Sequence, residues 1–143
     1  ENIDEDYFQE EVNSEETEKK YKNSGLTDSD IDAIHSRLIA LLDEEKIFVN
    51  PNLTLNELAK MLHVHPNYLS QVINSKEEKN FYELINKKRI DEFVKKLEDP
   101  ENKQYTLIAI AYECGFNSKA SFNRNFKKYF DLTPSEYQKK LES

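Results

Sequence analysis

The sequence predicts an all-α protein built from two helix-turn-helix units that a long linker helix joins. A helix-turn-helix pattern occurs twice, over Leu55–Ile73 and again over Leu107–Phe126. Elsewhere apolar residues recur at helical spacing, and no segment has the pattern of a strand. Residues 1–30 hold 11 acidic and 3 basic side chains, which accounts for the whole net charge of −8. We therefore expect an acidic leader and one extra N-terminal helix ahead of the two units.

The composition favours a soluble helical protein and argues against several other classes. With 143 residues, the chain has the size of one ordinary domain or two very small ones. No apolar run approaches the roughly 20 residues that span a bilayer. The single cysteine, Cys114, excludes an internal disulfide and fits a reducing compartment. The acidic opening without Met predicts a fragment of a longer protein and no signal peptide.

The leader, residues 1–26, is polar and acidic, and its composition predicts a largely disordered linker. The next segment, residues 27–50, is expected to hold the N-terminal helix and its connection. Thr27 or Asp28 caps this helix, which should end near Glu45. Its apolar face could pack on the first unit or pair two chains, and the sequence leaves both open. That face consists of Ile31, Ile34, Leu38, Leu41 and Leu42.

The first helix-turn-helix unit is expected over residues 51–79. Thr54 caps a helix over Leu55–Leu62, and Glu57 stands three residues on, where it can complete a capping box. His63 makes the turn, because His tolerates a positive φ better than most residues do.

The second helix of this unit begins at Pro66, with His65 or the turn as its cap, and should end near Asn74 before a charged loop. The linker helix is expected within residues 80–99. Its apolar stripe consists of Phe81, Leu84, Ile85, Phe93, Val94 and Leu97. A helix over residues 81–98, at a rise of ~1.5 Å per residue, makes a rod of roughly 27 Å.

The second unit is expected over residues 104–143 and contains one residue more than the first. The two copies lie 52 residues apart before the turn and 53 residues apart after it. Gly115 makes the second turn. The expected caps are Thr106, Asn117 or Ser118, and Thr133, and their helices should end near Cys114, Tyr129 and Leu141. Because each unit presents a second helix that can enter a groove, the pair of units points to DNA.

The segment Leu53–Leu141 resembles the DNA-binding domain of AraC/XylS-type bacterial transcription regulators. The resemblance rests on the strings LNELAKML…NYLSQVI, FYELINKKRIDEFVKKL and IAYECGFNSKASFNRNFKKYFDLTPSEYQK. The last string is similar to the family's most diagnostic segment nearly position for position. Two residues depart from glycines that are common in the family, namely His63 in the first turn and Asp131 before Leu-Thr-Pro. Neither departure is expected to disturb the fold.

The resemblance implies a bacterial regulator of transcription of the Bacteroidetes type. Its expected partners are double-stranded DNA, RNA polymerase and an upstream sensor domain. A homodimer through the missing upstream region or through the helix over 27–45 stays open. The domain would act in the cytoplasm, as part of a full-length protein that a membrane-spanning sensor could anchor in the inner membrane. No cofactor is implied.

The resemblance also assigns DNA contacts to the second helix of each unit. Gln71 and Asn67 suit adenine through paired hydrogen bonds, and Arg124 suits guanine or a phosphate. The expected base-reading residues are Asn67, Ser70, Gln71, Lys119, Ala120, Ser121 and Arg124, and the expected phosphate contacts are Asn74, Lys76, Lys79, Asn125, Lys127 and Lys128. Gln71, Ser121 and Asn125 are expected to be exposed, because the apolar anchors take other positions. Solvated surface charge is the alternative for the cationic residues.

The linker helix sets the expected spacing of the two recognition helices. Successive major grooves on one face of DNA lie roughly 34 Å apart, a distance that a rod of this length could approach. We therefore expect a monomeric module that reads an asymmetric site with two short elements about one turn apart.

Other functions have weaker support. His63 and His65 lack the further ligands that structural zinc requires, and Cys114 is expected in the core rather than as a nucleophile. With no Gly-rich phosphate loop either, the sequence predicts no enzyme, no metal and no cofactor. The alternative function is a protein-interaction module that docks through its acidic leader. For the leader itself, tethering is favoured over partial autoinhibition by competition with DNA for the basic face.

Overall fold

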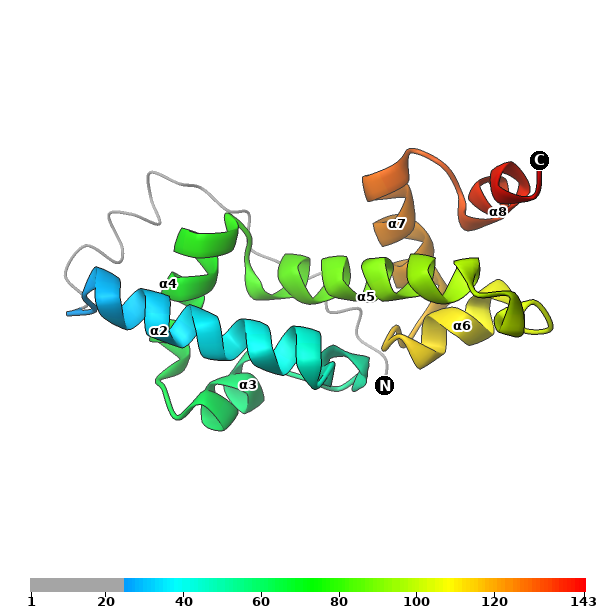
Figure 1. The fold of residues 1–143 in the computed structure, drawn as a ribbon. Helices are drawn as coiled ribbons and strands as arrows, with labels where there is room; N and C mark the ends of the chain where they lie inside the picture. Colours follow the sequence, from blue (N-terminus) through cyan, green and yellow to red (C-terminus); the bar gives the residue numbers. More distant parts are fainter. Residues whose placement is uncertain (1–24) are drawn as a thin grey trace. The chain divides into compact units, whose positions relative to one another are not determined.

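The computed structural model describes residues 25–143, and all regular structure in that range is helical. Seven α-helices occur among these residues, with one π-helical and two 3₁₀ turns. In chain order the elements are α2 (Asp28–Ile39), η2 (Ala40–Glu44), η3 (Ile47–Val49), α3 (Leu55–Leu62), α4 (Pro66–Glu77), α5 (Phe81–Glu98), η4 (Pro100–Asn102), α6 (Leu107–Glu113), α7 (Lys119–Phe130) and α8 (Pro134–Glu142) (Figure 1). The predicted all-α fold is confirmed for this part of the chain. The expected disorder of the leader concerns residues that lie, up to Ser24, outside the described range.

The chain divides into two compact units, and α5 contributes to both. The first unit contains α2, α3, α4 and the start of α5 as far as Leu84. The second contains residues 48–51, α5 from Ile85 onward, and α6, α7 and α8. Each helix-turn-helix pattern thus lies within one unit.

In the first unit, α2 packs against α4 and α3 (Figure 1). Ile34 and Leu38 of α2 and Leu42 of η2 are buried, so the apolar face that the sequence predicted packs within the chain. The Arg37 guanidinium donates a hydrogen bond of 2.6 Å to the carbonyl oxygen of Leu62, the last residue of α3. This carbonyl has no partner within its helix, so Arg37 satisfies it.

The last turn of α4 is held by polar contacts to α2. His35 Nε2 lies 2.6 Å from Glu77 Oε2, and Lys76 forms an ion pair with Asp32. The helix therefore continues to Glu77, and the predicted end near Asn74 is wrong. Charged residues at this point suggested a loop, whereas side chains of another helix stabilise one more turn.

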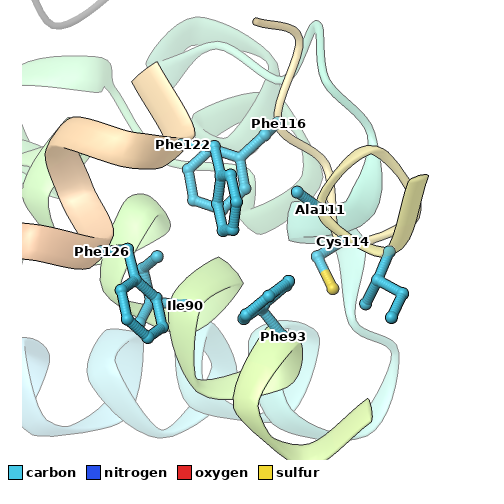
Figure 2. Close-up of a cluster of buried hydrophobic side chains, with 8 residues drawn as sticks. Ile90, Phe93, Ala111, Cys114, Phe116, Phe122 and Phe126 are labelled. Carbon is cyan, nitrogen blue, oxygen red and sulfur yellow. The ribbon is translucent and has the colours of Figure 1, made fainter. Parts of the chain in front are cut away.

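Aromatic side chains fill the core of the second unit (Figure 2). The ring of Phe93 on α5 has its centroid 4.6 Å from that of Phe122 and 5.7 Å from that of Phe126. Cys114 is fully buried in the same cluster, as expected of a core residue. Ile90, one turn before Phe93, packs there too, so α5 supplies one wall of this core.

A buried arginine attaches the segment after α2 to the second unit. Arg89 is only 5% exposed. Its Nε donates to the carbonyl oxygen of Phe48 at 2.8 Å, and its Nη2 donates to that of Asn50 at 3.0 Å. Gly115 closes against the same place, because a Cβ there would lie 2.3 Å from the Phe48 oxygen and its φ is +111°. The second turn therefore requires glycine for both its conformation and its size.

Candidate nucleic-acid interface

In the first unit, local caps and one left-handed residue set the angle between α3 and α4. The Thr54 hydroxyl accepts a hydrogen bond of 3.1 Å from the Glu57 amide, as predicted. His63 ends α3 with φ 57° and ψ 41°, so the turn predicted there is confirmed. His65 Nδ1 accepts from the Asn67 amide at 3.1 Å, which confirms His65 as the cap of α4.

The second unit has the same plan with different residues. The Thr106 hydroxyl caps α6 by accepting from the Ala109 amide at 3.1 Å. After the turn at Gly115, the Ser118 hydroxyl accepts from the Ser121 amide at 3.1 Å. Of the two residues considered for this cap, Ser118 is therefore the correct one. Both α4 and α7 therefore begin with a side-chain cap that satisfies one backbone amide of the first turn.

The predicted DNA-contacting residues of α4 differ in exposure. Asn67 is exposed, and Ser70 and Asn74 are partly exposed. Gln71 is only 7% exposed, so its expected exposure is wrong. Its Oε1 atom has no hydrogen-bond partner within the described residues. Gln71 stands at the position equivalent to Arg124 of α7, so the helical repeat predicted the same exposure for both. Burial depends on tertiary neighbours, which the repeat does not specify.

The two lysines expected to contact phosphates near the end of α4 have local partners. Lys76 is exposed and forms the ion pair with Asp32 of α2. Lys79 is partly exposed, and its Nζ donates to the carbonyl oxygen of Glu77 at 3.4 Å. An exposed ion pair is weak and can exchange its partner, so the Lys76 ammonium group can still meet an external anion.

On α7, one face gathers positive charge. Lys119, Ala120 and Arg124 are exposed, as are Lys127 and Lys128 near the end of the helix. No acidic residue occurs within α7, so this face attracts anions.

Two further predicted contacts on α7 are buried instead. Ser121 and Asn125 are each 6% exposed, so their expected exposure is wrong. Asn125 Nδ2 donates to the Ser121 carbonyl oxygen at 2.9 Å, within α7 itself. The polar groups of both residues are thus satisfied inside the unit, beside the buried rings of Phe122 and Phe126. Polar residue type suggested an outward role, whereas the fold uses these two side chains inside.

An open groove of ≈ 650 Å³ runs beside α7, and sequence reasoning did not find it. Lys119, Arg124 and Lys127 contribute its cations. Its apolar lining comes from Leu107, Ile108, Phe122 and Pro134. The groove combines the starts of α6 and α8 with one side of α7, so only the folded unit creates it.

The ring of Tyr129 on α7 lies near two cations. Lys128 Nζ lies 5.6 Å from the centre of the Tyr129 ring, and Lys87 Nζ of α5 lies 5.4 Å from it.

In residues 25–143, no three His, Cys, Asp or Glu side chains converge in a way that could hold a metal ion. The same residues include no helix with the length and hydropathy of a bilayer span.

Comparison with known proteins identifies the family. Residues 58–140 match the family described as "Helix-turn-helix domain". The chain belongs to this AraC/XylS-type helix-turn-helix family. YesN of Bacillus subtilis (strain 168), an uncharacterized transcriptional regulatory protein, is 33% identical to the AraC/XylS-type domain over 110 residues, which are 76% of this chain and 29% of YesN.

Solved structures agree with the AraC/XylS-type assignment. The C-terminal domain of AraT, a response regulator from Geobacillus stearothermophilus, is 26% identical with a TM-score of 0.58, over 77% of this chain and 84% of that one. A DNA-binding transcriptional dual regulator from Escherichia coli K-12 shares the fold at a TM-score of 0.61 and 21% identity, over 75% of this chain and 96% of that one. The chain thus holds an AraC/XylS-type domain that binds DNA in the regulation of transcription.

Proposed function

We propose that the chain binds double-stranded DNA sequence-specifically, with α4 and α7 in successive major grooves. The observation that carries this proposal is the exposed cationic face of α7, which follows a capped helix-turn-helix turn and includes Arg124. The major groove distinguishes all four base pairs, and a recognition helix fits into it. The proposed site is asymmetric, with two elements about one turn apart, because the two helices carry different residues.

Base reading is assigned to the outward residues of both helices. Arg124 suits guanine, whose O6 and N7 accept two hydrogen bonds from a guanidinium. Lys119 and Ala120 accompany it on α7, and Asn67 and Ser70 occupy α4. Ser121, being buried, supports α7 in this proposal and does not touch a base.

Gln71 stays in the proposed base-reading set despite its burial. A buried acceptor without a partner costs about 1–3 kcal/mol, so a state that supplies a donor is favoured. Adenine offers such a donor at N6 for a glutamine oxygen, next to the N7 acceptor for the glutamine amide. If the Gln71 side chain rotated toward the major groove of DNA, its Oε1 atom would gain the hydrogen-bond partner that it lacks.

Phosphate contacts are assigned to Lys127 and Lys128 of α7, and to Asn74, Lys76 and Lys79 of the first unit. Such contacts position a protein on the duplex without reading its sequence. Asn125 is withdrawn from this set, because its amide nitrogen already donates within α7.

The wider setting follows from the same proposal. The chain spans only 29% of the length of YesN, so an upstream sensor domain, RNA polymerase and a second copy of the chain are proposed partners of the whole protein. A cytoplasmic location of the domain is part of this proposal, because its DNA ligand lies there. Anchoring of the full-length protein in the inner membrane, and the absence of enzymatic activity, are further predictions.

The test is selection of binding sites from a random duplex pool, followed by anisotropy measurements over a salt series. We expect an asymmetric two-element motif. Arg124→Ala should weaken its binding by about 10-fold or more and relax one base position. Lys103→Ala, an exposed lysine outside both recognition helices, is the matched control and should bind as the parent does.

Other outcomes would change the assignment. Salt-sensitive binding without an enriched motif would show backbone contact alone. A single uninterrupted element would contradict reading by two helices. Absence of binding at low salt would favour a protein-interaction module that docks through the acidic leader.

A further inference from the structure

The groove beside α7 has a chemistry that DNA binding does not fully use. Lys119, Arg124 and Lys127 line the groove, and their positive charge would also attract a phosphate. The same groove is lined by Leu107 and Ile108, which are partly exposed there. A duplex backbone offers anions but little apolar surface, so it would leave this part of the groove unmatched.

This combination fits an acidic peptide with aromatic side chains. Apolar walls bind a ring by removing it from water, and neighbouring cations attract the carboxylates on either side of it. The volume of ≈ 650 Å³ lies within the ~300–1,000 Å³ typical of sites that bury a ligand.

One segment of this chain has the matching composition. Residues 4–11 read DEDYFQEE, in which two aromatic residues, Tyr7 and Phe8, stand between acidic residues on both sides. The segment lies in the leader, outside the described residues. Residues 12–24 connect it to the start of the described chain and can span at most about 45 Å at ~3.3–3.6 Å per residue.

We propose that residues 4–11 bind the groove beside α7 in the same molecule and compete there with DNA. The inference rests on the proposed function for its consequence, since Lys119, Arg124 and Lys127 would serve both ligands in turn. The docked leader then lowers the affinity of the second unit for DNA until a partner displaces the leader from the groove.

The expected size of the effect follows from tethering. A tether of this length gives an effective concentration in the millimolar range when it can span the distance. A weak peptide site with a Kd of about 1 mM would then reduce the affinity for DNA by roughly 3- to 10-fold. The reduction should shrink at high salt, because screening weakens the charged part of the contact.

The experiment uses the full chain with Tyr7→Ser and Phe8→Ser together, which removes the rings and keeps every charge. Tyr21→Ser, in the same leader but outside residues 4–11, is the matched control. We expect the double variant to bind its selected DNA 3- to 10-fold more tightly, and the control to bind as the parent does. In a double-mutant cycle, Ile108→Ala should reduce this gain, because Ile108 lines the groove.

A second measurement does not depend on DNA. Backbone amide NMR shifts of the parent and of the Tyr7, Phe8 variant are compared without DNA, and the differences should gather at Ile108, Asn123 and Ser135 around the groove. If DNA binding itself fails, these shifts still decide the docking. Unchanged shifts at the groove would overturn the proposal. Shifts that fade on dilution would overturn it too, since they would place the leader of a second molecule in the groove.

Discussion

The two helix-turn-helix units share a backbone plan and differ in how each turn and core is built. In the first unit, the turn depends on a histidine with φ 57°, and aliphatic side chains such as Leu58 and Leu69 fill the core. In the second, Gly115 takes φ +111° against a backbone carbonyl, and phenylalanine rings such as Phe93 and Phe122 fill the core. The first turn therefore accommodates a side chain, whereas the second has no room for a Cβ.

The two recognition helices also differ in charge. Helix α7 carries four exposed cations, Lys119, Arg124, Lys127 and Lys128, whereas α4 carries one, Lys76. In the proposed function, the second unit therefore supplies most of the phosphate attraction, and the first supplies hydrogen bonds from amides and hydroxyls. In this proposal the second unit contributes more to affinity for the DNA backbone, and the first unit contributes more to base selection.

The largest expected effect tests whether the two cores are independent. Phe93→Ala should destabilise the second unit by about 3–5 kcal/mol, because it opens a cavity among packed rings. Leu69→Ala should destabilise the first unit by about 2–5 kcal/mol. Amide hydrogen exchange should show loss of protection within the unit that carries each substitution. Equal loss throughout residues 25–143 would show one cooperative structure instead.

The next effect contrasts the two turns. Gly115→Ala should lower the free energy of unfolding by about 2–4 kcal/mol, since the new Cβ meets the Phe48 oxygen in an unfavourable conformation. At the corresponding turn, His63→Gly should raise stability by up to about 1 kcal/mol by relieving the left-handed strain. Urea unfolding monitored by circular dichroism measures both. Equal tolerance of both substitutions would contradict the contrast.

A smaller effect separates the two recognition helices. Replacing Lys119 and Lys127 by alanine should lower the slope of log K against log salt by about 2, one unit for each lost phosphate contact. Replacing Asn67 and Ser70 by alanine should leave the slope unchanged while relaxing base preference by about 1–3 kcal/mol per lost contact. Anisotropy over a salt series, with selected and scrambled duplexes, distinguishes the two results. A changed salt slope in the variant that lacks the Asn67 and Ser70 side chains would contradict this difference between α4 and α7.

The smallest effect concerns pH at the end of the second unit. The Thr133 amide donates to Glu136 Oε1 at 2.8 Å, and this bond, with one involving the Thr133 hydroxyl, lowers the pKa of Glu136 from 4.5. A lowered pKa contributes stability above pH 4.5 that is lost as the pH falls through the folded value. We expect α8 to fray in that window, and Glu136→Gln to abolish the pH dependence. NMR titration of the Thr133 amide measures it, and an unchanged titration in the variant would refute it.

Local features of the fold could be predicted from the sequence. The caps Thr54, Thr106 and Thr133 follow from a pattern of three or four residues, in which a hydroxyl meets a nearby backbone amide. The turn at His63 was likewise predictable, because apolar anchors on both sides fix its place.

Features that depend on distant residues could not be predicted. The last turn of α4 exists because Asp32 and His35 meet it from α2, more than 40 residues earlier in the chain. Arg89 is buried because the carbonyl oxygens of residues 48 and 50 accept its hydrogen bonds, and the pattern of the linker helix does not indicate these distant acceptors. The helical repeat likewise predicts the direction in which the Gln71 side chain points, but it does not predict which residues cover that side chain. The candidate site was therefore predicted in outline and corrected wherever tertiary burial decides.

The burial of Cys114 has a practical consequence for spectroscopy. Because its thiol is 0% exposed, reagents that label surface cysteines should pass over it in the folded chain. A pair of introduced cysteines, at Tyr68 of α4 and Ala120 of α7, could then carry two spin labels without a background signal. Pulsed dipolar measurements on that pair would give the separation of the two recognition helices as a distance distribution, with and without a duplex. That distance would show directly whether the two recognition helices lie one turn of DNA apart.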